Sequence, residues 1–250
     1  MSKIYYKGLA VEPEDSRDYP LSTYLAMTAQ PPLPRKYTVP NITPVRDQGS
    51  LGSCAAFASV VGLKEQQEQA ELIATQDSTS LQLSPLFVYQ LAKKLDGVSG
   101  QGTYLRVVLK VMAETGVCLE QCLPYRSRIG LTPCSDWREQ AEIFKISTYA
   151  KVDQDLEQIK RAIWAYGGMV LGVYTTYQWS RVNSTGVITF KSKRYRRGGH
   201  AIYGIGWDDD LNLFKFKNSW SDRWGDHGLG YLTYEYLMSE YLSGWTAIDF

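Results

Sequence analysis

The chain has 250 residues, of which 44% are hydrophobic and 13% aromatic, so it can bury a substantial core in one large domain or two closely packed halves. Its 27 basic and 26 acidic residues give a formal net charge of +1 and are spread along the chain. This balance creates no overall field that would attract nucleic acid or an anionic membrane, and we expect neither as a partner. No apolar run approaches the ~18 residues needed to cross a bilayer.

The N-terminus and the cysteines bear on the compartment in which the protein works. The first residues of the chain have neither the apolar core nor the small-residue cleavage pattern of a secretory signal. The four cysteines could form disulfides, but a chain of this length does not need them. We therefore expect four free thiols and a cytoplasmic location, with export after trimming of a signal as the alternative.

The first half of the chain is predicted to be mainly helical. Residues 1–40 are rich in proline and turn formers, and we expect them to run extended over the surface as an arm. Apolar residues then recur at helical spacing, which predicts helices over residues 55–72, 85–95 and 104–115. These helices would form one lobe, over residues 41–145.

The second half of the chain changes to short runs of β-branched and aromatic residues. A helix is predicted around residues 155–166, where Gly167 and Gly168 stop it. Strand candidates between Gly, Asn and Asp turns lie at residues 169–174, 186–190, 200–207, 213–217 and 230–232. We expect a β-rich lobe over residues 146–235 and a C-terminal tail over residues 236–250. Helices followed by strands indicate an α+β fold.

Cys54 follows a glycine-rich loop and opens the first long predicted helix. A helix N-terminus stabilises anions, so a thiol there should ionise more easily and become a better nucleophile. The backbone N–H of Cys54 should also point toward the space where a substrate carbonyl oxygen would lie. A buried structural cysteine is the alternative interpretation of an isolated cysteine.

Only two histidines could pair with this cysteine. His200 begins an apolar strand after a pair of glycines, whereas His227 lies in a polar turn and is expected on the surface. Asn218 ends the strand predicted at residues 213–217, which we expect to pair antiparallel with the strand of His200. That pairing could bring the Asn218 amide to the imidazole and fix its tautomer.

Two motifs resemble signatures of the papain family of cysteine peptidases. The run Gln48-Gly-Ser-Leu-Gly-Ser-Cys54-Ala-Ala-Phe57 resembles the nucleophile signature, and Asn218-Ser-Trp220 with the following Trp-Gly-Asp-His-Gly resembles the asparagine signature. His200 lies between them in the family's order, about 146 residues after Cys54 (54 to 200). Further matches are Leu83-Ser-Pro, Gly116-Val, Pro124-Tyr and Gly230-Tyr-Leu, so the resemblance covers residues 40–250.

The resemblance implies a role for each matching residue. Cys54 is similar to the nucleophile, His200 to its acid/base, Asn218 to the orienter of the histidine, and Gln48 to the side-chain donor of the oxyanion hole. The implied fold has two lobes, one helical and one of antiparallel strands, with the active-site cleft between them. The residues expected along this cleft as substrate-binding positions are Gly52, Ser53, Gly102, Thr103, Tyr104, Gly199 and Trp220, with Trp220 also shielding the asparagine–histidine bond.

Two departures from the family pattern limit what can be transferred. Leu51 stands where many members have a disulfide cysteine, which favours a bacterial-type member without the usual disulfides. Ala55 stands where tryptophan is usual, which leaves the primed side of the cleft more open. A basic segment before His200 is interpreted either as a solvated loop balanced by residues 208–210 or as a rim of the cleft that favours acidic substrates; its members are Lys191, Lys193, Arg194, Arg196 and Arg197.

The predicted function is that of a cysteine endopeptidase that hydrolyses peptide bonds through a thioester on Cys54, with no metal and no organic cofactor. We expect a monomer whose partner is a peptide or protein substrate. The alternatives are acyl transfer or isopeptide cleavage on the same fold and, as a different class, a binding module without turnover. Residues 1–40 could be a short autoinhibitory pro-segment or a permanent structural support.

Overall fold

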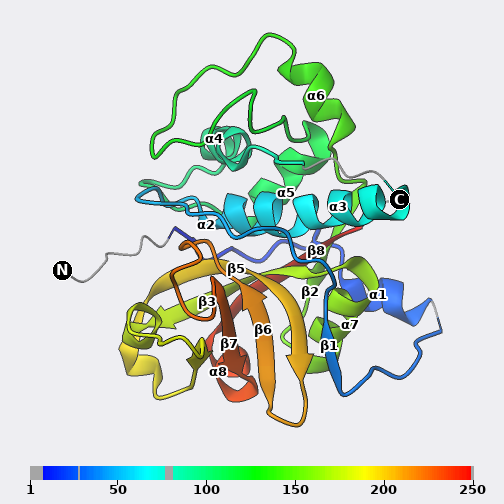
Figure 1. Ribbon diagram of the computed structural model, residues 1–250, viewed down its shortest axis with the longest axis vertical. Coiled ribbons are helices and arrows are strands. Elements are labelled where there is room, and N and C mark those ends of the chain that lie inside the picture. The colour runs from blue at the N-terminus through cyan, green and yellow to red at the C-terminus, as the bar shows by residue number, and fades with distance from the viewer. Residues whose placement is uncertain (1–7, 28, 77–80, 249–250) are drawn as a thin grey trace.

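The computed structural model describes residues 8–27, 29–76 and 81–248, which form a helical lobe and a β-sheet lobe (Figure 1). This arrangement confirms the predicted α+β fold. A continuous helix that begins at Cys54 lies along the boundary between the two lobes, and its middle part is π-helical. The helical segments of this lobe are α2 (Cys54–Ala56), η1 (Phe57–Lys64), α3 (Glu65–Ala74), α4 (Pro85–Leu95), α5 (Leu105–Glu114) and α6 (Trp137–Ile143).

Local sequence signals explain where these helices start and stop. The Ser84 side chain accepts a hydrogen bond from Phe87 N and Pro85 occupies the first turn, so α4 begins with a capped N-terminus. Gly116 follows α5 with a φ of 86°, and a Cβ there would overlap the carbonyl oxygen of Ala141. Only glycine therefore allows α5 and α6 to approach each other this closely.

The second lobe is one eight-stranded sheet in the order β2-β8-β3-β5-β6-β7-β4, with β1 paired to β5. All pairs are antiparallel except β4 with β7. The strands are β1 (Lys36–Thr38), β2 (Thr148–Val152), β3 (Met169–Thr176), β4 (Val187–Ile188), β5 (Arg196–Asp208), β6 (Leu213–Lys217), β7 (Leu229–Thr233) and β8 (Tyr241–Ile248). The helices beside them are α1 (Leu21–Ala26), α7 (Leu156–Tyr166), α8 (Tyr234–Glu240) and the short 3₁₀ turns η2 (Tyr177–Ser180) and η3 (Lys193–Tyr195).

The structure corrects the prediction of a C-terminal tail over residues 236–250. Its described part completes α8 and forms β8, which lies between β2 and β3 inside the sheet. Most of β8 is buried, so it lacks the alternation of exposed and buried residues by which a strand is recognised in a sequence. The last two residues lie outside the described residues.

The predicted N-terminal arm, residues 1–40, is only partly an extended surface segment. It contains α1, and its last part forms β1, which pairs with residues 206–208 of β5. Pro20 also bridges to Lys151 of β2. The second half of the arm is therefore part of the sheet lobe, and its first seven residues lie outside the described residues.

The prediction of four free thiols is wrong. Cys122 and Cys134 form a disulfide in the loop between α5 and α6, whereas Cys54 and Cys118 are free and buried. The loop folds back on itself, with Cys134 N donating to Cys122 O at 3.1 Å, and this long-range contact has no sequence signal. Four free thiols therefore no longer support the expected cytoplasmic location, which stays a prediction. Within the described residues, no helix is long and apolar enough to cross a membrane.

Candidate active site

Cys54 is the first residue of the helix between the lobes and is fully buried. Burial raises the pKa of its thiol, and the nearby backbone N–H groups of Ala201, Gly8 and Ala55 oppose this rise. The expected easier ionisation at the helix N-terminus is therefore outweighed by desolvation in this structure. Ala201 follows His200 on β5, so the sheet lobe presents the neighbour of the histidine directly to the sulfur.

His200 and Asn218 meet as predicted. Strands β5 and β6 pair antiparallel, with Tyr203 opposite Lys217, and His200 Nε2 lies 2.8 Å from Asn218 Oδ1. Both side chains are buried, and Asn218 Oδ1 also accepts a bond from Ser219 N at 2.8 Å. The second histidine, His227, is exposed, as predicted.

Trp220 covers the histidine. Its ring stacks on the His200 imidazole with centroids 4.4 Å apart and an interplanar angle of 27°. A second indole, Trp179, meets the imidazole edge-on at 5.7 Å and donates its Nε1–H to the Tyr236 hydroxyl. The sequence interpretation missed Trp179, because nothing in its local sequence marks it as a neighbour of the histidine. Together the two rings exclude water from the buried histidine–asparagine bond.

Gln48 is held at the junction of the two lobes. Its Nε2 donates to Leu51 O at 2.9 Å, its Oε1 accepts from the Ser219 hydroxyl at 2.6 Å, and its backbone N–H donates to Ser219 O. Ser219 is the neighbour of Asn218. Gln48 therefore connects the loop before Cys54 to the segment that orients the histidine.

Gly52 and Ser53 support the loop before Cys54. Gly52 N donates to Gln101 Oε1 at 2.8 Å, and the buried Ser53 hydroxyl shares a hydrogen bond with the Tyr125 hydroxyl at 2.7 Å. Tyr125 OH also bonds Gln48 O. In this structure the Ser53 side chain therefore points into the protein rather than toward a substrate.

The expected substrate-binding positions Gly102, Thr103 and Gly199 lie beside the N-terminal arm. Thr103 N donates to Gly8 O at 2.9 Å, and Ala10 N donates to Thr103 O at 3.0 Å. On the other side, Leu9 N donates to Gly199 O at 3.3 Å. At Leu9 the arm therefore pairs parallel with the segment of Thr103 in the helical lobe and antiparallel with the segment of Gly199 in the sheet lobe. It lies between the two lobes, beside Cys54. Tyr104 directly precedes α5, and its carbonyl accepts a bond from Val108 N.

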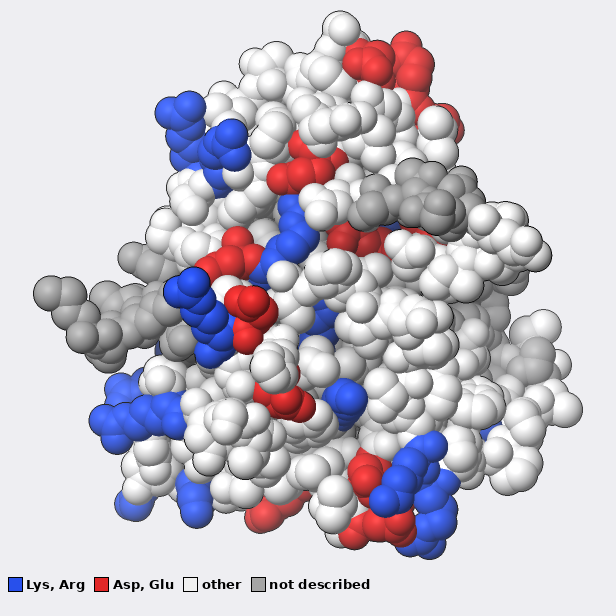
Figure 2. Space-filling view, in the orientation of Figure 1, with Lys and Arg blue, Asp and Glu red and all other residues white. Residues whose placement is uncertain are grey.

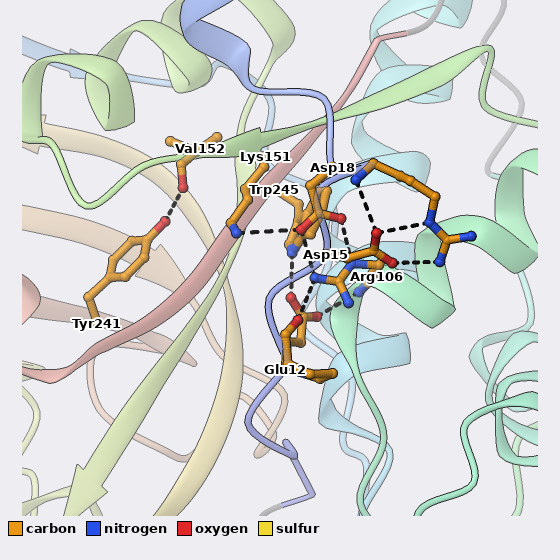
Figure 3. Close-up of polar contacts among 10 residues, drawn as sticks. Glu12, Asp15, Asp18, Arg106, Lys151, Val152, Tyr241 and Trp245 are labelled. Carbon is orange, nitrogen blue, oxygen red and sulfur yellow. Dashed lines mark hydrogen bonds and ion pairs between the residues drawn. The ribbon is translucent and has the colours of Figure 1, made fainter.

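A cluster around Arg106 holds the next part of the arm (Figure 3). Arg106 forms two hydrogen bonds with Asp18, at 2.6 and 2.7 Å, and its backbone N–H donates to Glu12 Oε1 at 2.7 Å. The indole of Trp245 donates to the second oxygen of Glu12 at 3.0 Å. Burial raises the pKa of Glu12 in this position. The side chains converge from the arm, α5 and β8, so the cluster ties the arm to both lobes.

The basic segment before His200 is not balanced by residues 208–210, and that part of the interpretation is wrong. Those acidic residues pair with Arg35, Lys36 and Lys160, whereas Arg196 pairs with Glu240 at 2.6 Å. Basic and acidic side chains are interspersed over the face shown in Figure 2. The hypothesis that the segment selects acidic substrates stays a prediction. No group of three or more His, Cys, Asp or Glu side chains among the described residues could hold a metal ion.

Comparison with known proteins gives consistent matches over most of the chain. The family model described as papain family cysteine protease matches residues 34–240. A peptidase C1-like protein of Acanthamoeba polyphaga mimivirus is 28% identical over 220 residues, which cover 82% of this chain and 69% of that protein. A cathepsin B-like protein of Giardia intestinalis is 29% identical over 75% of this chain, but the match spans 63% of the relative, less than two thirds of its length.

Solved structures agree with these sequence matches. The crystal structure of xylellain, a cysteine protease from Xylella fastidiosa, superposes with a TM-score of 0.81 and 27% sequence identity. The match covers 98% of this chain and 96% of that chain. The similarity therefore includes the segment before residue 34, where the family model does not reach.

Proposed function

Because this chain belongs to the papain family of cysteine proteases, we propose that Cys54, His200, Asn218 and Gln48 are the residues with which it hydrolyses peptide bonds as a cysteine endopeptidase. The observation that carries this proposal is the bond of 2.8 Å between His200 Nε2 and Asn218 Oδ1. Trp220 covers this bond, and the backbone N–H of Ala201, the residue after His200 on β5, faces the Cys54 sulfur. Acyl transfer and isopeptide cleavage have no comparable support.

The geometry gives each residue a step in the reaction. Asn218 engages Nε2 of His200, so Nδ1 takes the proton of Cys54 as the sulfur attacks the substrate carbonyl carbon. The oxyanion is stabilised by the Cys54 backbone N–H and by Gln48 Nε2. When the tetrahedral intermediate collapses, His200 returns the proton to the leaving amine and a thioester remains. Water, deprotonated by His200, then attacks the thioester, the carboxylic acid product leaves, and the proton returns to the sulfur.

We also propose that the arm closes this site as an autoinhibitory segment. Gly8 presents its backbone N–H to the Cys54 sulfur, while its carbonyl oxygen bonds Thr103 N. The backbone of the arm therefore lies beside the nucleophile and is bonded to the helical lobe at Thr103 and to β5 at Gly199, which leaves less room for a substrate. Because β1 is part of the sheet, activation would release residues 8–18 rather than remove the whole arm.

Labelling with an epoxysuccinyl peptide, read by intact mass, tests the catalytic assignment. The full chain, Cys54→Ala and His200→Ala are compared, each also carrying Gly8→Ala to displace the arm. One adduct on Cys54 that depends on His200 is expected. A folded Gly8→Ala protein that forms no adduct, or an adduct that does not need His200, would overturn the assignment. Masses of the products of a peptide cleaved in the presence of an added amine separate hydrolysis from acyl transfer.

We propose peptide or protein substrates and a monomeric enzyme, without a nucleic-acid or membrane partner. Peptide or protein substrates follow from the family. The proposal that nucleic acids and membranes are not partners is supported by the interspersed charges in Figure 2, which leave no face of one sign in that view. Size-exclusion chromatography with light scattering would give the mass of one chain if the enzyme is monomeric.

A further inference from the structure

Lys217 is a buried lysine that the catalytic scheme does not use. It is the last residue of β6, immediately before Asn218, and only 4% of its surface is exposed. Its ammonium group donates to Thr43 Oγ1 at 2.7 Å and to Val61 O at 2.9 Å. A buried charge is costly unless it is well bonded, so this arrangement is strongly determined by its surroundings.

The two acceptors of Lys217 lie on the chain segments that carry the other catalytic groups. Thr43 belongs to the segment that leads into Gln48, and Val61 belongs to the helix that begins at Cys54. Lys217 itself is adjacent to Asn218, which bonds His200. One ammonium group therefore connects the segments that carry Gln48, Cys54 and Asn218, and Asn218 in turn bonds His200 on β5.

The helix of Cys54 has a specific irregularity at this contact. Phe57–Lys64 is π-helical, and the N–H of Glu65 bonds the carbonyl of Val60, five residues earlier. Such wide turns take carbonyl groups out of the normal α-helical ladder and often occur at functional sites. Lys217 bonds the carbonyl of Val61 within this turn, so the lysine and the irregular helix fit each other.

The charged groups around Lys217 form a small buried network. Glu65, only 2% exposed, accepts hydrogen bonds from Arg46 Nη1 and Leu83 N, each at 2.9 Å, and Arg46 also pairs with Glu120. Burial lowers the pKa of Lys217 to about 8, with Glu65 opposing and Arg46 adding to that shift. Burial likewise raises the pKa of Glu65. Electrostatic attraction to Glu65 favours the charged form of the lysine.

We propose that Lys217 is a positioning residue for the catalytic reaction. Its ammonium group fixes β6, and with it Asn218 and His200, relative to the helix that carries Cys54. Since Cys54 and His200 belong to different lobes, their relative position depends on such contacts across the boundary, and small displacements of reacting groups are expensive. The inference rests on the proposed catalytic role of Cys54 and His200 and adds a residue that does not touch the substrate.

The first test is Lys217→Met, which keeps the length of the side chain and removes its charge and hydrogen bonds. The chain has only two histidines, so ring signals of ¹⁵N-labelled histidine report on His200 directly and do not require activity or an open cleft. We expect the titration midpoint and the tautomer-sensitive ¹⁵N shifts of His200 to change, and those of His227 to stay the same. In the Gly8→Ala background, kcat should fall at least about tenfold with little change in KM.

Lys160→Met is the matched control, because Lys160 is also largely buried and paired, with Asp209, but lies on α7 away from the catalytic segments. It should lower stability and leave the His200 signals and kcat unchanged. If Lys217→Met fails to fold, Thr43→Val removes one acceptor of the ammonium with little change of shape and should shift the His200 signals less, in the same direction.

Two results would overturn the inference. One is a folded Lys217→Met protein whose His200 titration and kcat equal those of the protein that keeps Lys217. The other is an equal effect of Lys160→Met, which would mean that both lysines act only through stability. Failure of the catalytic assignment would look different, since Cys54→Ala would then keep its activity.

Discussion

Gly8 packs directly against the backbone of Gly52, so closely that a Cβ on residue 8 would overlap the Gly52 carbonyl oxygen. The neighbouring atoms are backbone and cannot rotate away. Gly52 lies in the loop that leads into Cys54, so this contact places the arm at the entrance to the nucleophile. A single methyl group should therefore be enough to displace the arm.

The first prediction is that Gly8→Ala increases the initial rate of peptide cleavage and of Cys54 alkylation, by about tenfold or more if the overlap costs at least ~1.4 kcal/mol. Val11→Ala is the matched control, since Val11 is in the same arm but 55% exposed. The two variants are compared with the unmutated chain in a continuous fluorogenic assay. Equal rates for all three proteins, with intact folding, would mean that the arm is a support and not an inhibitor.

The second prediction concerns pH. Burial raises the pKa of Glu12 while the arm is in place, so this carboxyl group holds its proton more tightly in the closed state than when exposed. Closure therefore takes up protons and is favoured at low pH. It weakens as the pH rises from the ordinary pKa of Glu12, 4.5, through the raised pKa of the closed state.

The measurement for this prediction is the alkylation rate of Cys54 from about pH 4 to about pH 7, divided by the rate for Gly8→Ala at the same pH. The ratio should rise with pH, at most about tenfold per unit for one titrating carboxyl group. Glu12→Gln should flatten that rise. A ratio that increases on acidification would contradict the assignment of Glu12 as the coupled group.

The third prediction separates the catalytic from the structural contribution of Gln48. Gln48→Ala should reduce kcat by about 10²- to 10³-fold, because one oxyanion donor is lost. Ser219→Ala removes the hydrogen bond that Gln48 Oε1 accepts, but keeps the Gln48 amide. If the two variants lose stability alike and only Gln48→Ala loses this much kcat, the oxyanion role is supported. A similar loss in both would show that Gln48 acts by joining the lobes.

The fourth prediction is that the disulfide stabilises the helical lobe without taking part in catalysis. Cys122 and Cys134 are 12 residues apart, and replacing both by serine should cost about 3 kcal/mol and lower the Tm by roughly 6 to 12 °C. The adduct on Cys54 should still form. Alkylation of the denatured chain without reductant should modify two thiols, Cys54 and Cys118, and modification of four would contradict the disulfide.

The sequence by itself determined the parts of the site that depend on local pattern. The loop before Cys54 and the apolar spacing after it predict a helix with the thiol at its first residue, and residues 213–217 have the alternation of a strand that ends at Asn218. Antiparallel pairing then follows from two adjacent strands joined by a short turn, and it places Asn218 beside His200. Ser84 and Gly116 likewise mark helix ends through their own chemistry.

Only the tertiary structure decided the contacts between segments that are far apart in the chain. The disulfide, the burial of β8 within the sheet and the position of Trp179 beside His200 depend on how the loops and lobes fold together, which no local pattern encodes. Burial also reversed the expected ionisation of Cys54, because desolvation depends on what covers a group and not on its neighbours in sequence. The position of the arm residue Gly8, bonded to Thr103 and close to Cys54, was likewise decided only by the tertiary structure, since the sequence predicted no more than an extended arm.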